Sequence, residues 1–343
     1  MMPRLTFRPT IAALLLLLAA CTTPADIKPD AAATLVWPSA PADARVVFVR
    51  TISRPGDLGI VKGFFQRFVE FVFGETQAQL IRPMAVIDVD NVLYVADPGA
   101  KGVHRFDRRA GRYDLIRAAG GTQLPSPVGL ARGENGGVYV ADSALGDVYL
   151  IGRDAKFAAR VPLTAGLGQP TGIAFDMAAR RLYVVDTSGH RVNVYGLDGG
   201  LLSTIGRRGG GDGEFNFPTM IWRNAAGRIL VTDSLNFRTQ IFDADGRFVG
   251  KFGRAGDGGG DSPRQKGVAT DRYGHVYVVD ALLHGVQIFD ESGTFLLAIG
   301  GLGEAPGEFR LPAGIFIGDD DTIYVADAYN QRVQVFRYVG GPS

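Results

Sequence analysis

The stretch Tyr94-Val95-Ala96-Asp97 is the first of six similar tetrapeptides in this chain. Each copy begins with an aromatic residue or Leu, continues with Val and then a small residue or Val, and ends in Asp. The other copies are Tyr139-Val140-Ala141-Asp142, Tyr183-Val184-Val185-Asp186, Leu230-Val231-Thr232-Asp233, Tyr277-Val278-Val279-Asp280 and Tyr324-Val325-Ala326-Asp327. The closing Asp recurs at intervals of 45, 44, 47, 47 and 47 residues. A repeat of about 45 residues with short apolar strands and Gly or Pro turns is typical of one β-propeller blade.

The third repeat shows the expected strands most clearly. Its apolar runs at 170–175, 181–186, 191–195 and 201–205 predict four short antiparallel strands. The turn Asp198-Gly199-Gly200 joins the last two. Because both faces of such a sheet are apolar, neighbouring sheets must cover them, and one blade alone would be unstable. We therefore predict an all-β fold, a six-bladed β-propeller of four-stranded antiparallel blades.

The last repeat lacks an outer strand, because the chain ends seven residues after Phe336. The segment 44–52 resembles the outer strands expected at 247–252 and 294–299. We predict that this N-terminal segment pairs with the strand at 332–336, which would close the ring and remove a free sheet edge.

The N-terminal residues predict export and lipidation. Arg4 and Arg8 precede an apolar run at 11–18, which is too short to span a bilayer as a permanent helix. The sequence Leu18-Ala19-Ala20-Cys21 resembles a bacterial lipobox, and Cys21 is the only Cys in the chain. We therefore expect lipidation at Cys21. The alternative is an ordinary secretory peptide with an incidental Cys.

These features predict three parts: a signal peptide over 1–20, a flexible tether over 21–43 and a propeller over 44–343. Thr22 follows the Cys, where an Asp would more often mark retention at the inner membrane of Gram-negative bacteria. We expect a domain anchored by lipid to the outer membrane and facing the periplasm. With no second Cys, this domain has no disulfide and depends on packing.

The charge of the mature chain is close to neutral. The whole chain has 36 basic and 35 acidic residues, and the signal peptide contains two Arg and no acid, so the mature balance is 34 minus 35, or −1. There is no long basic run either, which argues against nucleic acid as a partner.

Several segments resemble NHL repeats, most clearly 211–218, 303–312 and 327–336. The resemblance extends over residues 82–338, although Gln265 replaces the Pro expected in the fifth repeat. It implies a propeller, commonly of six blades. It also implies that many members are binding platforms and a minority are enzymes.

The residues that could carry metal chemistry do not suggest a metal site or any other cofactor. The aligned Asp residues each end a second strand, where Asp commonly accepts backbone hydrogen bonds from the next turn. NHL-type amidating lyases, which the predicted fold resembles, hold zinc through several His. The four His here are His104, His190, His275 and His284, and none is on an expected inner strand. The inner-strand openings also lack the Glu and Asn that lactonase-type propellers use for a divalent cation.

Positive charge gathers where the inner strands of the first, fifth and sixth repeats begin. The residues concerned are Arg82, Arg264, Lys266 and Arg310. We predict that they meet at one end of the central channel and bind an anionic ligand or partner surface. The alternative is ordinary solvated charge.

The insert at 53–80 departs from the repeat, and within it the segment 60–73 predicts an amphipathic helix. Its apolar face includes Phe64, Phe65, Phe68, Phe71 and Val72. Either this face packs on the propeller, or it contacts the membrane or a partner groove.

The sequence thus favours a lipid-anchored binding or scaffolding module rather than an enzyme. The expected partners are the membrane, through the lipid, and a protein, peptide or glycan. The alternative is a lyase or lactone hydrolase that acts at one end of the channel.

Overall fold

The computed structural model describes residues 35–60 and 78–341 of the chain. These belong to one compact unit, Leu35–Ser343. The helices described are three short 3-10 turns, η1 (Pro55–Leu58), η2 (Glu134–Gly136) and η3 (Ser234–Asn236).

Six antiparallel sheets of four or five strands make up this unit, and we number them as blades in chain order. Blade one contains β3 (Ala85–Val89), β4 (Val92–Asp97), β5 (Gly102–Asp107) and β6 (Arg112–Ile116). Blade two contains β9 (Pro127–Arg132), β10 (Val138–Asp142), β11 (Asp147–Ile151) and β12 (Ala158–Arg160). Blade three contains β13 (Pro170–Asp176), β14 (Arg181–Asp186), β15 (Arg191–Gly196) and β16 (Leu201–Ile205).

Blade four contains β17 (Pro218–Arg223), β18 (Ile229–Asp233), β19 (Arg238–Phe242) and β20 (Phe248–Phe252). Blade five contains β21 (Gln265–Thr270), β22 (Val276–Asp280), β23 (Gly285–Phe289) and β24 (Phe295–Gly300). Blade six contains β25 (Ile315–Ile317), β26 (Thr322–Asp327) and β27 (Arg332–Tyr338), together with β1 (Val36–Trp37) and β2 (Val46–Ile52). A separate small hairpin is formed by β7 (Ala118–Ala119) and β8 (Thr122–Gln123).

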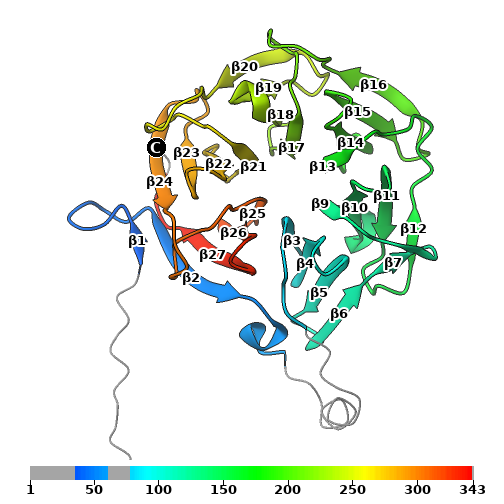
Figure 1. Ribbon diagram of the computed structural model, residues 1–343, viewed down its shortest axis with the longest axis horizontal. Coiled ribbons are helices and arrows are strands. Elements are labelled where there is room, and N and C mark those ends of the chain that lie inside the picture. Colours follow the sequence, from blue (N-terminus) through cyan, green and yellow to red (C-terminus); the bar gives the residue numbers. More distant parts are fainter. Residues whose placement is uncertain (1–34, 61–77, 342–343) are drawn as a thin grey trace, which may run out of the picture. The chain divides into compact units, whose positions relative to one another are not determined.

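The blades form a ring in which the first strand of each blade lies nearest the centre (Figure 1). The predicted six-bladed propeller of four-stranded blades is therefore confirmed. The four strands expected in blade three also match β13 to β16 closely.

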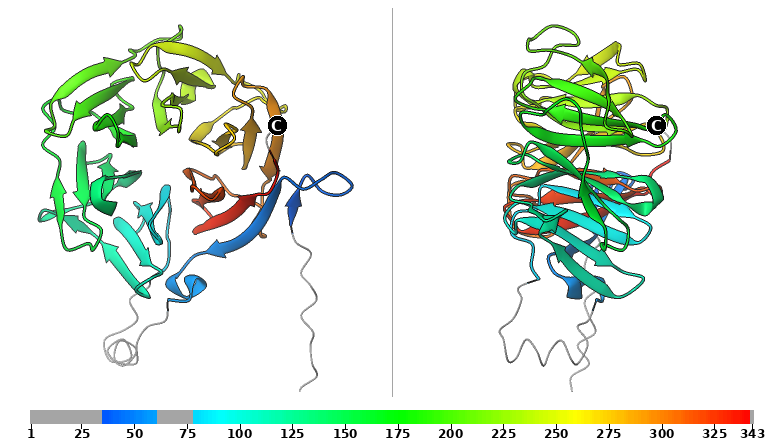
Figure 2. Two further views of the ribbon diagram at one scale, coloured as in Figure 1. Left: turned by 180° about the vertical axis from the view of Figure 1, so that it is seen from behind. Right: turned by 90° about the vertical axis from the view of Figure 1, so that its right-hand side faces the viewer.

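The outer strand of blade six comes from the N-terminal part of the chain. β2 pairs antiparallel with β27, with Phe48 opposite Phe336 and Ile52 opposite Val333. Figure 2 shows these two strands side by side at opposite ends of the colour range.

Ordered structure begins earlier than the sequence suggests. β1 adds a fifth strand to blade six and lies within the segment 21–43, which was predicted to be a tether. The Trp37 ring packs edge-on against Phe336 with 5.7 Å between centroids, and this buried aromatic contact explains why the segment is held on the blade.

The predicted helix at 60–73 lies outside the described residues, apart from Ile60. The same holds for Phe64, Phe65, Phe68, Phe71 and Val72. Ile60 is itself buried, together with Leu80, in the core cluster beside blade one.

The core consists of layers between neighbouring blades. Buried side chains of blades three and four form one cluster, and those of blades two and three form another. Further clusters join blades four and five, and blades five and six. Each sheet is thus covered by its neighbours, as the apolar strands require.

The inner strands approach one another closely. Gly172 lies beside the inner strand of blade four, and a Cβ atom on Gly172 would be 2.7 Å from the Cα atom of Met220. Only Gly fits such a contact without a shift of the backbone. Neighbouring inner strands are therefore packed closely around the channel.

Within the described ranges, the structure contains no helix with the length and apolar character that a membrane crossing requires.

We predict that a chain beginning at Ser53 is much less stable than one beginning at Ala44. Only the longer chain keeps β2, whose Val46 and Ile52 side chains are buried. Loss of these two buried side chains should lower the melting temperature by about 10 °C or more. Thermal unfolding of the two purified chains followed by circular dichroism tests this, and equal melting temperatures would contradict it.

Candidate functional site

The six aligned Asp residues anchor the segments that lead into the inner strands. All six are buried, and each accepts hydrogen bonds from backbone N–H groups. In blade one, both Ile81 and Arg82 donate their backbone N–H to Asp97, at 2.6 and 3.0 Å. Asp97 also accepts from Ala100 in the following turn. The structural role predicted for these residues is confirmed, and it extends to the start of each blade.

These bonds show that the predicted cations occupy two different positions of the repeat. Arg82, Arg264 and Arg310 each donate the backbone N–H to the aligned Asp of their own blade, at 2.8 to 3.0 Å. Ser126, Gln169 and Asn216 do the same in the other three blades. Arg82 and Arg264 directly precede the residue in the Pro position of the repeat, whereas Arg310 lies one residue earlier, as Asn216 does. The backbone at each of these positions is therefore held in place independently of which side chain the residue carries.

Two adjoining cavities open at the end of the channel where the inner strands begin. We call the first the mouth cavity, about 390 Å³, and the second the side cavity, about 530 Å³. Five residues line both: Met84, Val128, Arg264, Lys266 and Ala313. We refer to the two cavities together as the mouth.

Three of the four predicted cations meet at the mouth. Arg264 and Lys266 line both cavities, and Arg82 lines the side cavity. No Asp or Glu is among the described residues that line either cavity, and none of the described carboxylates forms an ion pair with these three side chains. The cations are therefore free of protein counter-charges within this part of the chain.

Arg310 differs from the other three. Its guanidinium lies 3.5 Å from the Glu304 carboxylate, and it lines neither cavity. The sequence placed it correctly at the start of blade six but did not predict that its side chain pairs elsewhere.

Lys266 is half-buried, and its environment disfavours the charged ammonium form. Burial lowers the pKa of Lys266, and the neighbouring positive charge of Arg264 lowers it further. An anion bound beside Lys266 would remove part of this penalty.

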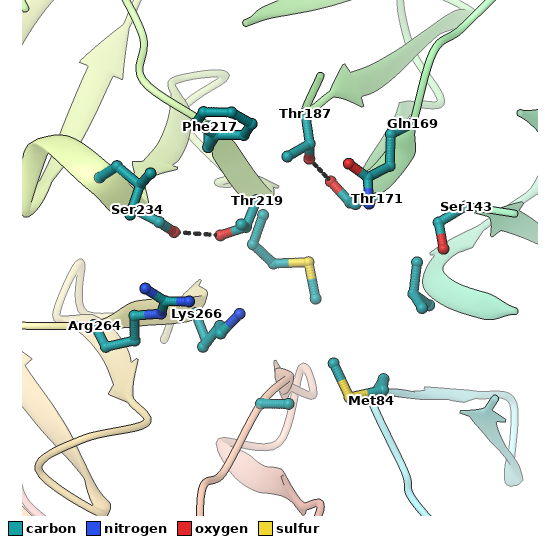
Figure 3. Close-up of a pocket in the computed structure, with 14 residues that line it drawn as sticks. Met84, Ser143, Gln169, Thr171, Thr187, Phe217, Thr219, Ser234, Arg264 and Lys266 are labelled. Carbon is teal, nitrogen blue, oxygen red and sulfur yellow. Dashed lines mark hydrogen bonds between the residues drawn. The ribbon is translucent and has the colours of Figure 1, made fainter. Parts of the chain in front are cut away.

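Hydroxyl and amide groups of blades three and four form a wall of the mouth cavity that begins beside the cations of blade five (Figure 3). Thr171 is hydrogen-bonded to Thr187 at 2.7 Å, and Thr219 is hydrogen-bonded to Ser234 at 2.7 Å. The Gln169 side chain lies on the same wall. A ligand can thus meet the cations and neutral hydrogen-bonding groups together.

This hydroxyl wall was missed by the sequence analysis. Ser143, Thr187 and Ser234 each follow an aligned Asp directly, so the repeat did contain a signal. Two of them also join neighbouring blades, because Thr187 donates to the Pro218 carbonyl and Ser234 to the Gln265 carbonyl. Their polarity therefore has a structural use as well.

The other end of the channel combines apolar side chains with the charged side chains of Arg132, Arg223 and Asp319. A cavity of about 210 Å³ there is lined by side chains that include Trp222 and Phe316. These two rings pack edge-on, and Trp222 donates its indole N–H to Thr270 at 2.9 Å. Met220 lines both this cavity and the mouth cavity, so it lies between the two ends.

The four His residues serve the packing of the blades. His190 and His284 accept the backbone N–H groups of Phe217 and Leu311, which join one blade to the next. His104 is fully buried beside Tyr113. His275 is bonded to Asp271. Among the described residues, no cluster of three His, Cys, Asp or Glu side chains is placed to hold a metal ion.

The comparisons with known proteins agree with the fold. A family model described as a 6-bladed beta-propeller matches residues 267–340. No curated protein matches the chain.

Several solved structures are similar. A protein of unknown function from Bacteroides thetaiotaomicron is 14% identical with a TM-score of 0.60, covering 76% of this chain and 70% of its own. An auxiliary nutrient binding protein from the same organism is 14% identical with a TM-score of 0.59, covering 77% and 71%. A catalytically inactive virginiamycin B lyase from Staphylococcus aureus, crystallised with quinupristin, is 14% identical with a TM-score of 0.56, covering 75% and 95%. At such identities these similarities show the fold alone.

We predict that Asp280→Ala lowers the free energy of unfolding by about 3 kcal/mol, because three backbone N–H groups lose a charged acceptor. The donors are Arg264, Leu282 and Leu283. Asp319→Ala is the control, since this side chain is 95% exposed and should change stability by less than about 0.5 kcal/mol. Urea unfolding measures both, and similar effects would contradict the anchoring role of Asp280.

Proposed function

We propose that this chain is an exported lipoprotein whose NHL-type propeller binds a carboxylate-bearing ligand at the mouth. One observation carries the proposal: Arg82, Arg264 and Lys266 line one opening, and no described carboxylate pairs with them. Guanidinium and ammonium groups bind carboxylates through short, charge-assisted hydrogen bonds. Because the aligned Asp residues fix the backbone at Arg82 and Arg264, such a ligand meets donors that are already positioned.

The size and walls of the mouth support a ligand with a polar body. The hydroxyl groups of Thr171 and Thr219 and the amide of Gln169 can bond neutral parts of a peptide or glycan. Phe217 and Tyr329 border the two cavities and are 39% and 58% exposed, so they offer apolar surface at the rim. An acidic peptide and an acidic glycan share the carboxylate that the cations would bind.

A binding role also agrees with the description of one similar structure as an auxiliary nutrient binding protein. A lyase has a similar fold. We favour binding because the features at the mouth are hydrogen-bond donors and cations, which suit recognition. Stoichiometric zinc or calcium in the purified protein would favour the lyase or lactone hydrolase alternative.

The proposed anchor is a lipid on Cys21, joined to the propeller by a short tether. In this arrangement the propeller faces the periplasm from the outer membrane. The Phe-rich segment 60–73 stays a prediction, either as a helix that covers part of the domain or as a second membrane contact.

We predict that the combined change Arg82→Gln, Arg264→Gln and Lys266→Gln weakens binding of acidic ligands at least about tenfold, because charge-assisted hydrogen bonds are lost. Arrays of acidic and neutral peptides and glycans identify the ligand, and calorimetry in detergent with the full chain measures its affinity. Added salt should weaken the binding as well.

The matched control changes the same amount of charge at exposed cations that line neither cavity. These are Lys156→Gln, Arg180→Gln and Arg247→Gln. Equal loss of affinity in the two triple variants would show that only overall charge matters, and would overturn the proposed site.

Lipidation predicts a clear difference in detergent partitioning. The full chain expressed in a Gram-negative host should enter the detergent phase of Triton X-114, and Cys21→Ser should remain in the aqueous phase. Anchoring through Cys21 is ruled out if both proteins partition alike.

A further inference from the structure

Lys266 differs from the other lysines that the structure describes. The chain contains six Lys. Lys156 and Lys251 form ion pairs with Asp154 and Asp212, and Lys101 is exposed in a turn. Lys266 alone among these four is half-buried and lines a cavity. Its amine is therefore held in a partly desolvated site that a small molecule can enter.

The backbone around Lys266 is fixed on both sides. The Thr232 hydroxyl donates to the Lys266 carbonyl at 2.9 Å. The next residue, Gly267, donates its N–H to the Ala313 carbonyl in blade six at 2.9 Å. Both bonds join β21 to a neighbouring blade, so the Lys266 side chain extends from a rigid inner strand.

The environment of Lys266 raises the fraction of neutral amine above that of a free lysine. Burial and the adjacent Arg264 charge both lower its pKa, and no carboxylate among the described lining residues opposes them. A neutral amine is a nucleophile, whereas the ammonium form is not. Desolvation and a neighbouring cation are the two means by which proteins activate lysine in this way.

Arg264 lies on the same side of the mouth cavity as Lys266 (Figure 3). Its guanidinium has no acceptor among the described side chains, so it can bind a ligand carboxylate. The hydroxyl wall begins beside both residues, at Ser234 and Thr219, and continues to Thr187 and Thr171. In a small molecule with a carboxylate near a carbonyl group, the carboxylate would contact the Arg264 guanidinium and the carbonyl would contact the Lys266 amine.

We propose that the mouth takes a carboxylate ligand that also carries an aldehyde or ketone, and that Lys266 binds this carbonyl covalently as an imine. The inference rests on the proposed carboxylate site and names its ligand class. The Lys266 nitrogen attacks the carbonyl carbon, a new carbon–nitrogen bond forms, and the carbonyl oxygen leaves as water with the two amine protons. No oxidant or reductant takes part, and water reverses the reaction.

Reductive trapping tests the imine directly. The full chain in detergent is treated near neutral pH with glyoxylate and sodium cyanoborohydride, which converts an imine to a stable carboxymethyl-lysine. Peptide mass spectrometry then gives the rate of modification at each Lys. Lys266 should react several-fold faster than Lys101 and Lys156, because a lowered pKa raises the fraction of neutral amine near neutral pH and the Arg264 guanidinium holds the glyoxylate carboxylate beside it.

Two variants separate the parts of the proposal. Lys266→Arg keeps a cation at the mouth, so it should still bind malonate, a carboxylate without a reactive carbonyl, but should give no trapped product there. Arg264→Gln should slow trapping of glyoxylate more than trapping of the uncharged glycolaldehyde, because it removes the partner of the carboxylate as well as the charge that helps to lower the Lys266 pKa. Melting temperatures of both variants confirm that they fold.

The failure of the imine and the failure of the carboxylate site give different results. Suppose that Lys266 reacts no faster than Lys101 and Lys156, that malonate binds to the wild-type protein, and that Arg264→Gln abolishes this binding. The imine is then overturned and the carboxylate site remains. If malonate does not bind, and Arg264→Gln slows the modification of Lys266 by glyoxylate and by glycolaldehyde by the same factor, the carboxylate site is overturned.

Discussion

The site depends on one repeated interaction, the hydrogen bonds that a buried Asp carboxylate accepts from the backbone leading into each inner strand. In blade one these donors are Ile81 and Arg82, and in blade five the donor is Arg264. A buried carboxylate is stable only when such donors surround it, so the chain must approach the Asp at this point. The same bonds leave the side chains free to differ. Six anchored segments therefore surround the channel opening, and their side chains vary from blade to blade without a change of fold.

Burial and hydrogen bonding act on Asp97 in opposite directions. Burial alone would raise its pKa, but the His104 ring, whose Nε2 atom lies 3.4 Å from the carboxylate, and the hydrogen bonds from the backbone of Ile81, Ala100 and Arg82 outweigh burial, so the pKa is lowered. A carboxylate with a pKa lowered by folding stabilises the folded state above its unfolded pKa. This stabilisation is lost only as the pH falls through the folded pKa. The anchor in blade one is therefore intact at neutral pH.

The repeat made the fold predictable, because the aligned Asp gives the blade count and the strand pattern gives the sheets. The position of Arg82, Arg264 and Lys266 at one opening also followed from the repeat, because all three lie where an inner strand begins and their blades, one and five, both adjoin blade six. Contacts outside the repeat could not be predicted in this way. The ion pair of Arg310 with Glu304 depends on side-chain directions, and the strand at Val36–Trp37 depends on its pairing with β2 and on the contact of Trp37 with Phe336. The sequence does show that Thr187 and Ser234 follow aligned Asp residues, but only the structure shows that their hydroxyl groups line the channel opening.

Hydrogen exchange of single backbone amides tests the central interaction most directly. The amides of Arg82, Arg264 and Arg310 lie before the inner strands, yet each donates to a buried Asp. The account predicts that they exchange as slowly as the amides inside β4 and β22, and that Asp280→Ala speeds exchange at Arg264 alone among the three. Exchange at the rate of exposed turns in the wild-type protein would contradict the view that the carboxylates hold the opening in place.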